Sequence, residues 1–115
     1  MTRKQRHAEY GDCPIEAALD LIGGKWKGSI LFRCGEQTRR FNELGRLFPK
    51  ISQRMLTNQL RELEADGLLH REVFAEVPPR VEYSLTPKGR SLLPALRSLY
   101  DWGETYALPV RMPAP

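Results

Sequence analysis

Cysteine and histidine are scarce in this chain of 115 residues, which contains two of each. Cys13 and Cys34 are too few for a disulfide framework, and their separation is not the C-x-x-C spacing of a zinc site. His7 and His70 stand far apart in the sequence and supply no clustered ligands. The sequence therefore predicts no metal site, no cofactor and no disulfide scaffold.

Long apolar runs are absent too. No segment approaches the roughly 20 apolar residues that a membrane-spanning helix needs, and the polar residues 1–6 are not followed by the apolar core of a signal peptide. We therefore expect a cytoplasmic protein without a membrane partner. Its length suits one domain with a modest core.

Acidic residues are almost missing from one stretch of the chain. Residues 37–61 contain six cations and one acid, a net charge of +5, whereas residues 62–85 contain two cations and six acids, a net charge of −4. The whole chain carries a formal charge of only +4. A local positive field of this kind favours a polyanionic partner such as nucleic acid.

Helical patterns, separated by glycine and proline, occupy most of the chain. The first helix should end at Gly23-Gly24, and the second should end at Gly35. Ser52 is the expected N-cap of the fourth helix, and Gly67 is its expected C-cap. The expected helices span residues 14–22, 25–34, 41–48, 53–66 and 87–106.

The two ends of the chain differ from this helical pattern. Residues 1–12 are basic and polar, and we expect a flexible arm there. Residues 108–115 are rich in proline, and we expect a disordered tail. The single domain then spans residues 13–107.

Two strand-like patterns follow the fourth helix, at residues 68–74 and 81–85. Between them, Pro78 and Pro79 supply no N–H groups, so this segment cannot continue a ladder and forms a stiff projecting tip. The connection at residues 48–51 is short, which places the third and fourth helices at an angle, as in a helix-turn-helix. A helix-turn-helix followed by a hairpin is a winged helix, a mainly α fold with a small β-hairpin (α+β).

The fourth helix has two chemically different faces. An apolar stripe faces one way and consists of Leu56, Leu60 and Leu63. The opposite side carries cations and hydrogen-bonding groups but no carboxylate, and consists of Arg54, Thr57, Asn58 and Arg61. Arginine matches guanine, asparagine matches adenine and the threonine methyl matches thymine, so this face suits readout of the DNA major groove. An ordinary amphipathic helix whose polar face meets water would give the same pattern.

Polar residues beside this face are further candidates for DNA contact. Gln53 can reach a base or the backbone, and Ser52 is an N-cap that can also touch a phosphate. Lys50, Arg39 and Arg40 are candidate phosphate contacts, although simple solvated charge explains them nearly as well.

The tip of the hairpin offers a contact with the minor groove. Pro78 and Pro79 hold the backbone fixed, so Arg80 loses less entropy when it enters a groove. We therefore place Pro79 and Arg80 in the DNA interface. The alternative is an exposed Arg80 that pairs with Glu76 or Glu82.

Apolar residues in the first and last helices exceed what one small domain can bury. A second copy of the chain is the simplest cover, so we expect a homodimer. The residues expected at the dimer surface are Ile15, Leu19, Leu92, Leu96, Leu99, Trp102 and Tyr106.

Several motifs, in order and naturally spaced, resemble those of the HxlR-type helix-turn-helix regulators. They are Cys13 to Glu16, Ile22 to Lys27, Arg40 to Leu44, Ile51 to Thr57, Leu60 to Leu68 and Val77 to Thr86. The resemblance covers about residues 12–103 and implies a bacterial or archaeal transcription regulator, a homodimeric winged helix related to MarR proteins. It implies a nucleoid-associated regulator, not an enzyme, that binds a pseudo-palindromic double-stranded DNA operator. We expect a repressor, although the sequence does not distinguish repression from activation. It identifies neither the operator nor a small-molecule effector.

Cys13 is a candidate sensor because it precedes Pro14 at the expected start of the first helix, where the helix dipole stabilises a thiolate. Some members of the resembling family use a cysteine at this position to sense oxidants or electrophiles, which implies the same role for Cys13. Asp12 and Glu16 oppose thiolate formation. The alternative is a small buried residue that packs at the dimer surface.

Two other function classes fit parts of the sequence. A winged helix that binds only proteins would show no salt-dependent affinity for duplex DNA, whereas an operator-binding protein loses affinity steeply as salt rises. A thiol enzyme would need a base beside Cys13, and His7 lies in the expected arm. The basic face of the fourth helix favours the DNA-binding regulator.

Overall fold

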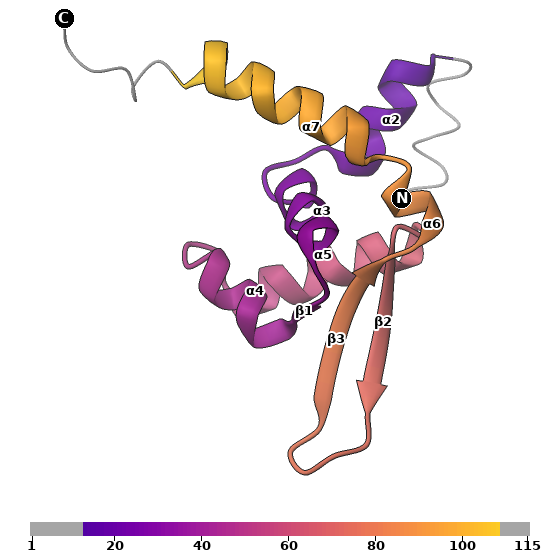
Figure 1. Ribbon diagram of the computed structural model, residues 1–115, viewed down its shortest axis with the longest axis vertical. Coiled ribbons are helices and arrows are strands. Elements are labelled where there is room, and N and C mark those ends of the chain that lie inside the picture. Colours follow the sequence, from indigo (N-terminus) through magenta and orange to yellow (C-terminus); the bar gives the residue numbers. More distant parts are fainter. Residues whose placement is uncertain (1–12, 109–115) are drawn as a thin grey trace, which may run out of the picture.

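The structure is a computed structural model that describes residues 13–108. The predicted arm at residues 1–12 and the predicted tail beyond residue 108 lie outside the described residues. The helices are α2 (Pro14–Ile22), α3 (Lys27–Glu36), α4 (Phe41–Leu47), α5 (Gln53–Ala65), α6 (Pro87–Arg90), α7 (Leu93–Trp102) and the π-helical turn η1 (Gly103–Ala107). The strands are β1 (Arg39–Arg40), β2 (Leu69–Phe74) and β3 (Arg80–Leu85). The predicted fold class, mainly α with a small antiparallel sheet, is confirmed (Figure 1).

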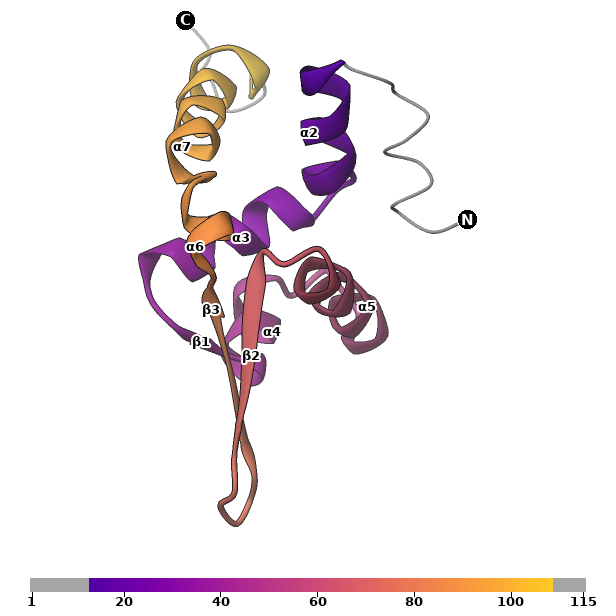
Figure 2. The ribbon, with the colours of Figure 1, turned by 90° about the vertical axis from the view of Figure 1, so that its right-hand side faces the viewer.

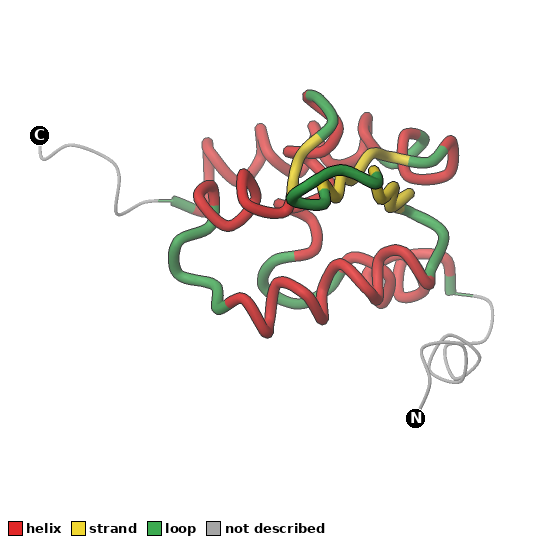
Figure 3. Tube along the Cα trace, turned by 90° about the horizontal axis from the view of Figure 1, so that it is seen from below, coloured by secondary structure: helices red, strands yellow, loops and turns green. Residues whose placement is uncertain are grey.

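The strands form one antiparallel sheet in the order β1-β3-β2. β2 and β3 make the predicted hairpin, in which Phe74 lies opposite Arg80 near the tip. We call residues 69–85 the wing, because this hairpin projects from the helical body (Figures 1 and 2). β1 pairs its Arg39 with Tyr83 of β3. Seen from below, the strands occupy one small region of a chain otherwise built from helices and loops (Figure 3).

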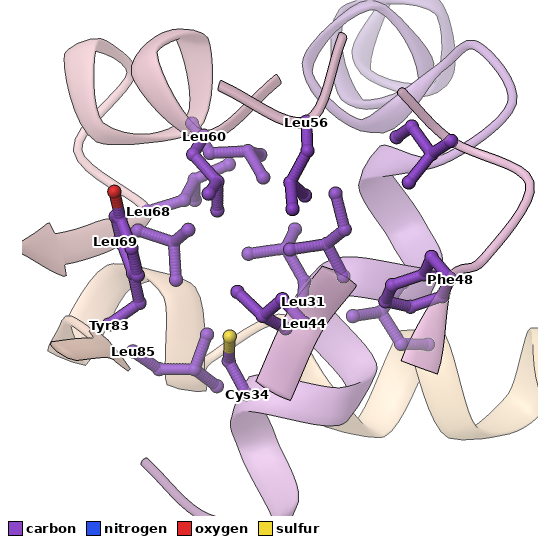
Figure 4. Packing of buried hydrophobic residues seen from close by; sticks show 14 residues of the cluster. Leu31, Cys34, Leu44, Phe48, Leu56, Leu60, Leu68, Leu69, Tyr83 and Leu85 are labelled. Carbon is purple, nitrogen blue, oxygen red and sulfur yellow. The ribbon is translucent and has the colours of Figure 1, made fainter. Parts of the chain in front are cut away.

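The core lies where α3, α4, α5 and β3 meet (Figure 4). The apolar stripe predicted for the fourth helix is confirmed, since Leu56, Leu60 and Leu63 are at most 1 % exposed. The other core side chains are Ile30, Leu31, Cys34, Leu44, Phe48, Ile51, Leu68, Leu69, Tyr83, Leu85 and Leu96. Burial of the leucine stripe determines which face of α5 points outwards.

The predicted N-cap of α5, Ser52, is confirmed, whereas its C-cap is Asp66 and the predicted C-cap, Gly67, is the next residue. The Ser52 hydroxyl accepts a hydrogen bond from the Met55 N–H at 3.1 Å, as an N-cap does. Gly67 has φ +77°, the left-handed conformation with which glycine commonly follows the end of a helix. Because both signals are local, the sequence predicts the limits of α5 to within one residue: the predicted end is residue 66, and the helix ends at Ala65.

The prediction that Gly35 ends the second helix is wrong. α3 begins at Lys27 and continues through Gly35 to Glu36. A Cβ atom on Gly35 would lie 2.5 Å from the Cδ2 atom of Leu93, so glycine lets this side chain of α7 pack closely against α3. The glycine marks a helix contact and not a helix end.

The single last helix expected at residues 87–106 is divided into α6, α7 and η1. Pro94 has no N–H group to donate to the carbonyl of Arg90, so a continuous helix cannot pass this point. The first piece, α6, is also held close to the chain after α5: a Cβ atom on Gly89 would lie 2.2 Å from the carbonyl oxygen of Leu68. The break lets α7 leave the body in its own direction (Figure 1).

Two of the helices stand away from the wing. α2 and α7 lie at the end of the molecule opposite the wing tip, with α3 between them and the rest of the body (Figure 2). α2 ends at Gly23, and Gly24 follows with φ +87°. No helix within residues 13–108 is long and apolar enough to cross a membrane.

Candidate nucleic-acid interface

The face of α5 that points away from the core carries the predicted base-reading side chains. Arg54, Asn58 and Arg61 are exposed, and Thr57 is half-buried beside them. Within the described part of the chain, the ion pairs join other residues, so the guanidinium groups of Arg54 and Arg61 are available to an anion. The structure thus brings four predicted contact residues onto one accessible surface, which we call the α5 face.

Three more predicted residues lie at the N-terminal end of α5. Lys50, Ser52 and Gln53 are all exposed. The Ser52 hydroxyl already caps the helix, so a phosphate contact would be an additional use of that group. The first N–H groups of a helix and a neighbouring lysine together favour an anion such as phosphate.

A hollow of about 400 Å³ separates α5 from the wing. Thr57, Arg61 and Glu64 line it from α5, and Arg71 and Tyr83 line it from the wing. Arg71 was not predicted to contact DNA, because it lies in the acidic stretch at residues 62–85. The signal was available: a strand has a period of two, so Arg71 shares a face with the buried Leu69 and points towards the body.

The environment of Arg39 does not fit the predicted phosphate contact. Its side chain is only 11 % exposed. The guanidinium forms an ion pair with Glu36 at 2.8 Å and donates a hydrogen bond from Nε to the Arg33 carbonyl oxygen at 3.0 Å. Arg39 therefore holds β1 against the end of α3 and has little surface left for DNA.

Arg40, by contrast, is exposed next to the N-terminus of α4. Its backbone N–H donates to the Glu43 carboxylate at 3.0 Å, which leaves its guanidinium out of that interaction. Arg40 lines a second hollow, of about 310 Å³, with Asn42 and with Pro79 at the wing tip. The structure thus brings together two predicted contact residues that are far apart in the sequence.

Arg80 is engaged within the wing. It begins β3, and its guanidinium lies 4.1 Å from the centre of the Phe74 ring and 3.2 Å from the carboxylates of both Glu76 and Glu82. Pairing of Arg80 with Glu76 or Glu82 was the alternative to a minor-groove contact. The wing tip itself consists of Val77, Pro78 and Pro79, which are exposed.

The positions of these elements agree with those of known proteins. The HxlR-like helix-turn-helix family model matches residues 21–111, a range that includes α5 and the whole wing. The chain belongs to the HxlR-like helix-turn-helix family. The predicted resemblance is therefore confirmed, and this HxlR-like chain is a transcriptional regulator of the helix-turn-helix type.

Several relatives of this HxlR-like chain are similar over most of its length. YdeP, an uncharacterized HTH-type transcriptional regulator of Bacillus subtilis, is 57 % identical over 98 residues, which are 85 % of this chain and 77 % of YdeP. The redox regulator HypR in its oxidized form is 57 % identical, with a TM-score of 0.77 over 81 % of this chain and 96 % of that chain. A chain described as a MarR-family transcriptional regulator of Porphyromonas gingivalis W83 is 38 % identical, with a TM-score of 0.79 over 84 % of this chain and 94 % of that chain.

The apolar residues expected at a dimer surface fall into two groups in this HxlR-like chain. Those on α2, on the later turns of α7 and on η1 are 48–69 % exposed: Ile15, Leu19, Leu99, Trp102 and Tyr106. The prediction that Leu96 lies at the dimer surface is wrong, because Leu96 is 5 % exposed and packs over Gly28 of α3 as part of the core. Leu92 is half-buried against the same core. We call the exposed group the α2/α7 surface.

The two cysteines of this HxlR-like chain have opposite environments. Cys13 is exposed and precedes the first residue of α2 as its N-cap. Cys34 is buried on α3. Burial raises the pKa of the Cys34 thiol from 9.0 to about 12, although the Arg39 guanidinium acts in the opposite direction. A thiolate is the reactive form of cysteine, so Cys34 is protected from oxidants and Cys13 is accessible to them.

Proposed function

We propose that this HxlR-like chain binds double-stranded DNA sequence-specifically as a homodimer and represses transcription from a pseudo-palindromic operator. The α5 face is the observation that carries the proposal, because exposed Arg54, Asn58 and Arg61 stand on a helix whose other side is fixed in the core. A regulator of this kind acts on the chromosome, so we also propose a cytoplasmic, nucleoid-associated location.

The roles of the α5 side chains follow from their chemistry. Arg54 and Arg61 each bind the guanine O6 and N7 atoms or a phosphate, Asn58 binds adenine, and the Thr57 methyl packs against thymine. Arg71 faces the same hollow as Arg61 and adds a cation from the wing side. The DNA backbone that passes between a recognition helix and a wing would run beside this pair.

Two cations and one neutral amide around α5 would hold the DNA backbone in place. Lys50, Gln53 and Arg40 are exposed, and each carries side-chain N–H groups that donate to phosphate oxygens. Such contacts give affinity without sequence preference and make binding sensitive to salt. Base contacts by the α5 face then supply the preference for one operator.

The α2/α7 surface supports the homodimer. The helices that carry its exposed side chains, α2 and α7, lie at the end of the molecule opposite the wing tip, so a partner bound there leaves the wing uncovered (Figure 2). A hollow of about 480 Å³ between α2, α3 and α7, lined by Leu19, Leu99 and Tyr100, offers space for side chains of a second copy. A two-fold pair then places two α5 helices in successive major grooves, roughly 34 Å apart.

Footprinting on the DNA that flanks the chain's own gene tests the proposal. We expect a protected site with two-fold symmetry and a half-site spacing of about one helical turn. At a protein concentration just sufficient for wild-type protection, Arg54→Ala should protect the site less, whereas Arg90→Ala, which removes an exposed cation from α6, should protect it as the wild type does. A winged helix that binds only proteins would give no footprint at any DNA sequence.

We propose that oxidation of the Cys13 thiol controls DNA binding by this regulator. Cys13 is exposed at the start of α2, a helix of the α2/α7 surface, and the similar HypR is a redox regulator. Oxidation at Cys13 would place a new group beside the dimer surface. A gel shift before and after mild oxidant should change for the wild type and stay constant for Cys13→Ser, and equal wild-type affinity in both states would remove the switch.

A further inference from the structure

Lys27 is a charged side chain in the protein interior. It is 3 % exposed, and no other charged residue between 13 and 108 is classed as buried. Its Nζ atom donates a hydrogen bond to the Glu62 Oε1 atom, so an ion pair joins the first residue of α3 to the last turn of α5. The Glu62 side chain remains 46 % exposed. A buried cation of α3 is therefore attached to the helix that carries the α5 face.

This ion pair is not explained by the needs of either helix alone. A lysine at the start of a helix and a glutamate in the last turn both oppose the helix dipole. A buried ammonium also loses its hydration, and an apolar side chain of similar volume often packs at this kind of position with equal or better stability. What the pair adds is directionality, because a hydrogen bond has a preferred geometry whereas apolar contacts are non-directional.

The leucine stripe alone does not fully determine the rotation and axial position of α5 against the core. Leu56, Leu60 and Leu63 hold α5 against the core through apolar contacts, which are non-directional. Glu62 follows Arg61 directly and lies one turn beyond Asn58, so rotating or sliding Glu62 moves the α5 face by a similar amount. The bond from Lys27 restrains both movements.

A second set of polar bonds holds the same end of α5 from the other side. The Lys88 Nζ atom donates to the Asp66 carbonyl oxygen at 3.0 Å, and the Thr86 hydroxyl donates to the Gly67 carbonyl oxygen at 2.6 Å. Thr86 and Lys88 belong to the start of α6, which leads into α7, while Lys27 starts the helix that follows α2. Each helix of the α2/α7 surface is thus connected through the chain to a polar bond on the end of α5.

We infer that Lys27 is a positioning residue: through Glu62 it fixes the rotation and axial position of α5 relative to the α2/α7 surface, and so sets the half-site spacing that the homodimer accepts. The inference rests on the proposed function, because spacing has a meaning only for a two-fold DNA-binding protein. Lys27 itself touches no DNA in this account. Its effect should appear in the choice between spacings, and not in the contacts that each α5 makes within one half-site.

The test is a set of duplexes in which the central spacer of the footprinted operator is lengthened or shortened by one base pair. The variant is Lys27→Met, which keeps an unbranched apolar side chain and removes the ammonium. The matched control is Lys25→Met, since Lys25 is exposed two residues before Lys27, in the loop that precedes α3, and has its ammonium 5.3 Å from the centre of the Trp26 ring. We expect the preference of Lys27→Met for the native spacer to fall by about fivefold, as pairwise coupling energies allow. Binding to a single half-site should not change.

A second variant separates positioning from simple stability. Glu62→Gln keeps an oxygen that accepts the bond from Lys27, whereas Glu62→Met does not, so Gln should retain the spacing preference and Met should lose it. Circular dichroism and sedimentation show that each variant is folded and dimeric before it is compared. If Lys27→Met does not fold, the Glu62 pair of variants carries the test alone.

The outcomes distinguish this inference from the proposed function. A spacing profile of Lys27→Met and Glu62→Met identical to that of the wild type overturns the positioning role, even where their stability falls. Wild-type protein that binds no duplex at any spacing overturns the proposed function, and the positioning role with it. A loss of spacing preference in the Lys25→Met control as well would assign the effect to charge in the loop and also overturn the inference.

Discussion

The guanidinium of Arg80 lies 4.1 Å from the centre of the Phe74 ring, directly across the wing in the β2–β3 register. Carboxylates of Glu76 and Glu82 hold it from the sides, each at 3.2 Å. A cation over an aromatic ring and between two acids is restrained before any DNA arrives. Insertion into the minor groove would therefore require Arg80 to leave Glu76 or Glu82, and phosphate or base oxygens would have to replace those partners.

Replacement of Arg80 by alanine tests this part of the wing. We expect operator affinity to fall by about tenfold, as for the loss of one groove contact worth about 1.4 kcal/mol, while unfolding in urea changes by less than about 1 kcal/mol. Fluorescence anisotropy on the footprinted duplex measures the affinity, with Arg90→Ala as the charge control. Unchanged affinity for Arg80→Ala would mean that Arg80 only supports the hairpin.

Leu96 and Leu99 should respond differently to truncation, although they lie one turn apart on α7. Leu96 is 5 % exposed and Leu99 is 53 % exposed. Leu96→Ala leaves a cavity in the core, so the free energy of unfolding should fall by about 2–5 kcal/mol. Leu99→Ala should leave monomer stability nearly unchanged and weaken dimerisation, as measured by sedimentation equilibrium. A dimer constant unaffected by Leu99→Ala would argue against the α2/α7 surface.

The raised pKa of the buried Cys34 thiol predicts a specific pH dependence of the free energy of unfolding. Its pKa is raised from 9.0 to about 12 in the folded chain, so the unfolded chain loses this proton first as pH rises. The contribution of Cys34 is therefore constant below about pH 9 and is lost above it, by at most about 1.4 kcal/mol per pH unit. Urea unfolding from about pH 8 to about pH 10.5 should show a steeper decline for the wild type than for Cys34→Ala. Parallel curves would contradict a buried neutral thiol.

Thiol labelling provides an independent check on both cysteines. An aromatic disulfide reagent should modify only Cys13 in the folded protein, because Cys34 is buried and protonated, and should modify both after unfolding in urea. Cys13→Ser should then show no fast reaction. Rapid modification of two thiols in the folded wild type would place Cys34 within reach of oxidants and reopen its role in sensing.

Local signals in the sequence were sufficient for the DNA-binding half of the fold. The leucine stripe of α5 repeats at helical spacing, Ser52 caps the start of the helix, Gly67 follows its end in the left-handed conformation, and Pro78 and Pro79 interrupt the ladder at the tip. Each of these effects involves residues within a few positions of one another. That is why the limits of α5 and the presence of the wing could be predicted.

The remaining features depend on residues that are distant in the sequence. The role of Gly35 is visible only when Leu93 is seen to pack against it, and the burial of Leu96 depends on Gly28 of α3. The sequence does not show that Arg39 is mostly buried, because its contacts with Glu36 and the Arg33 carbonyl oxygen depend on how the chain turns after α3. The break before α7 is different, since Pro94 was visible in the sequence and its missing N–H could have been recognised.

The most direct test of the account is the salt dependence of operator binding by the wild type and by Arg54→Ala. With fluorescence anisotropy on the footprinted duplex, we expect wild-type affinity to fall by about 10³-fold between about 50 mM and about 200 mM salt, as for a dimer with several phosphate contacts. Arg54→Ala should bind more weakly by about 1–3 kcal/mol at every salt concentration, and less selectively for the operator over unrelated duplex. Wild-type binding that is absent, insensitive to salt or unchanged by Arg54→Ala would contradict the claim that α5 reads DNA.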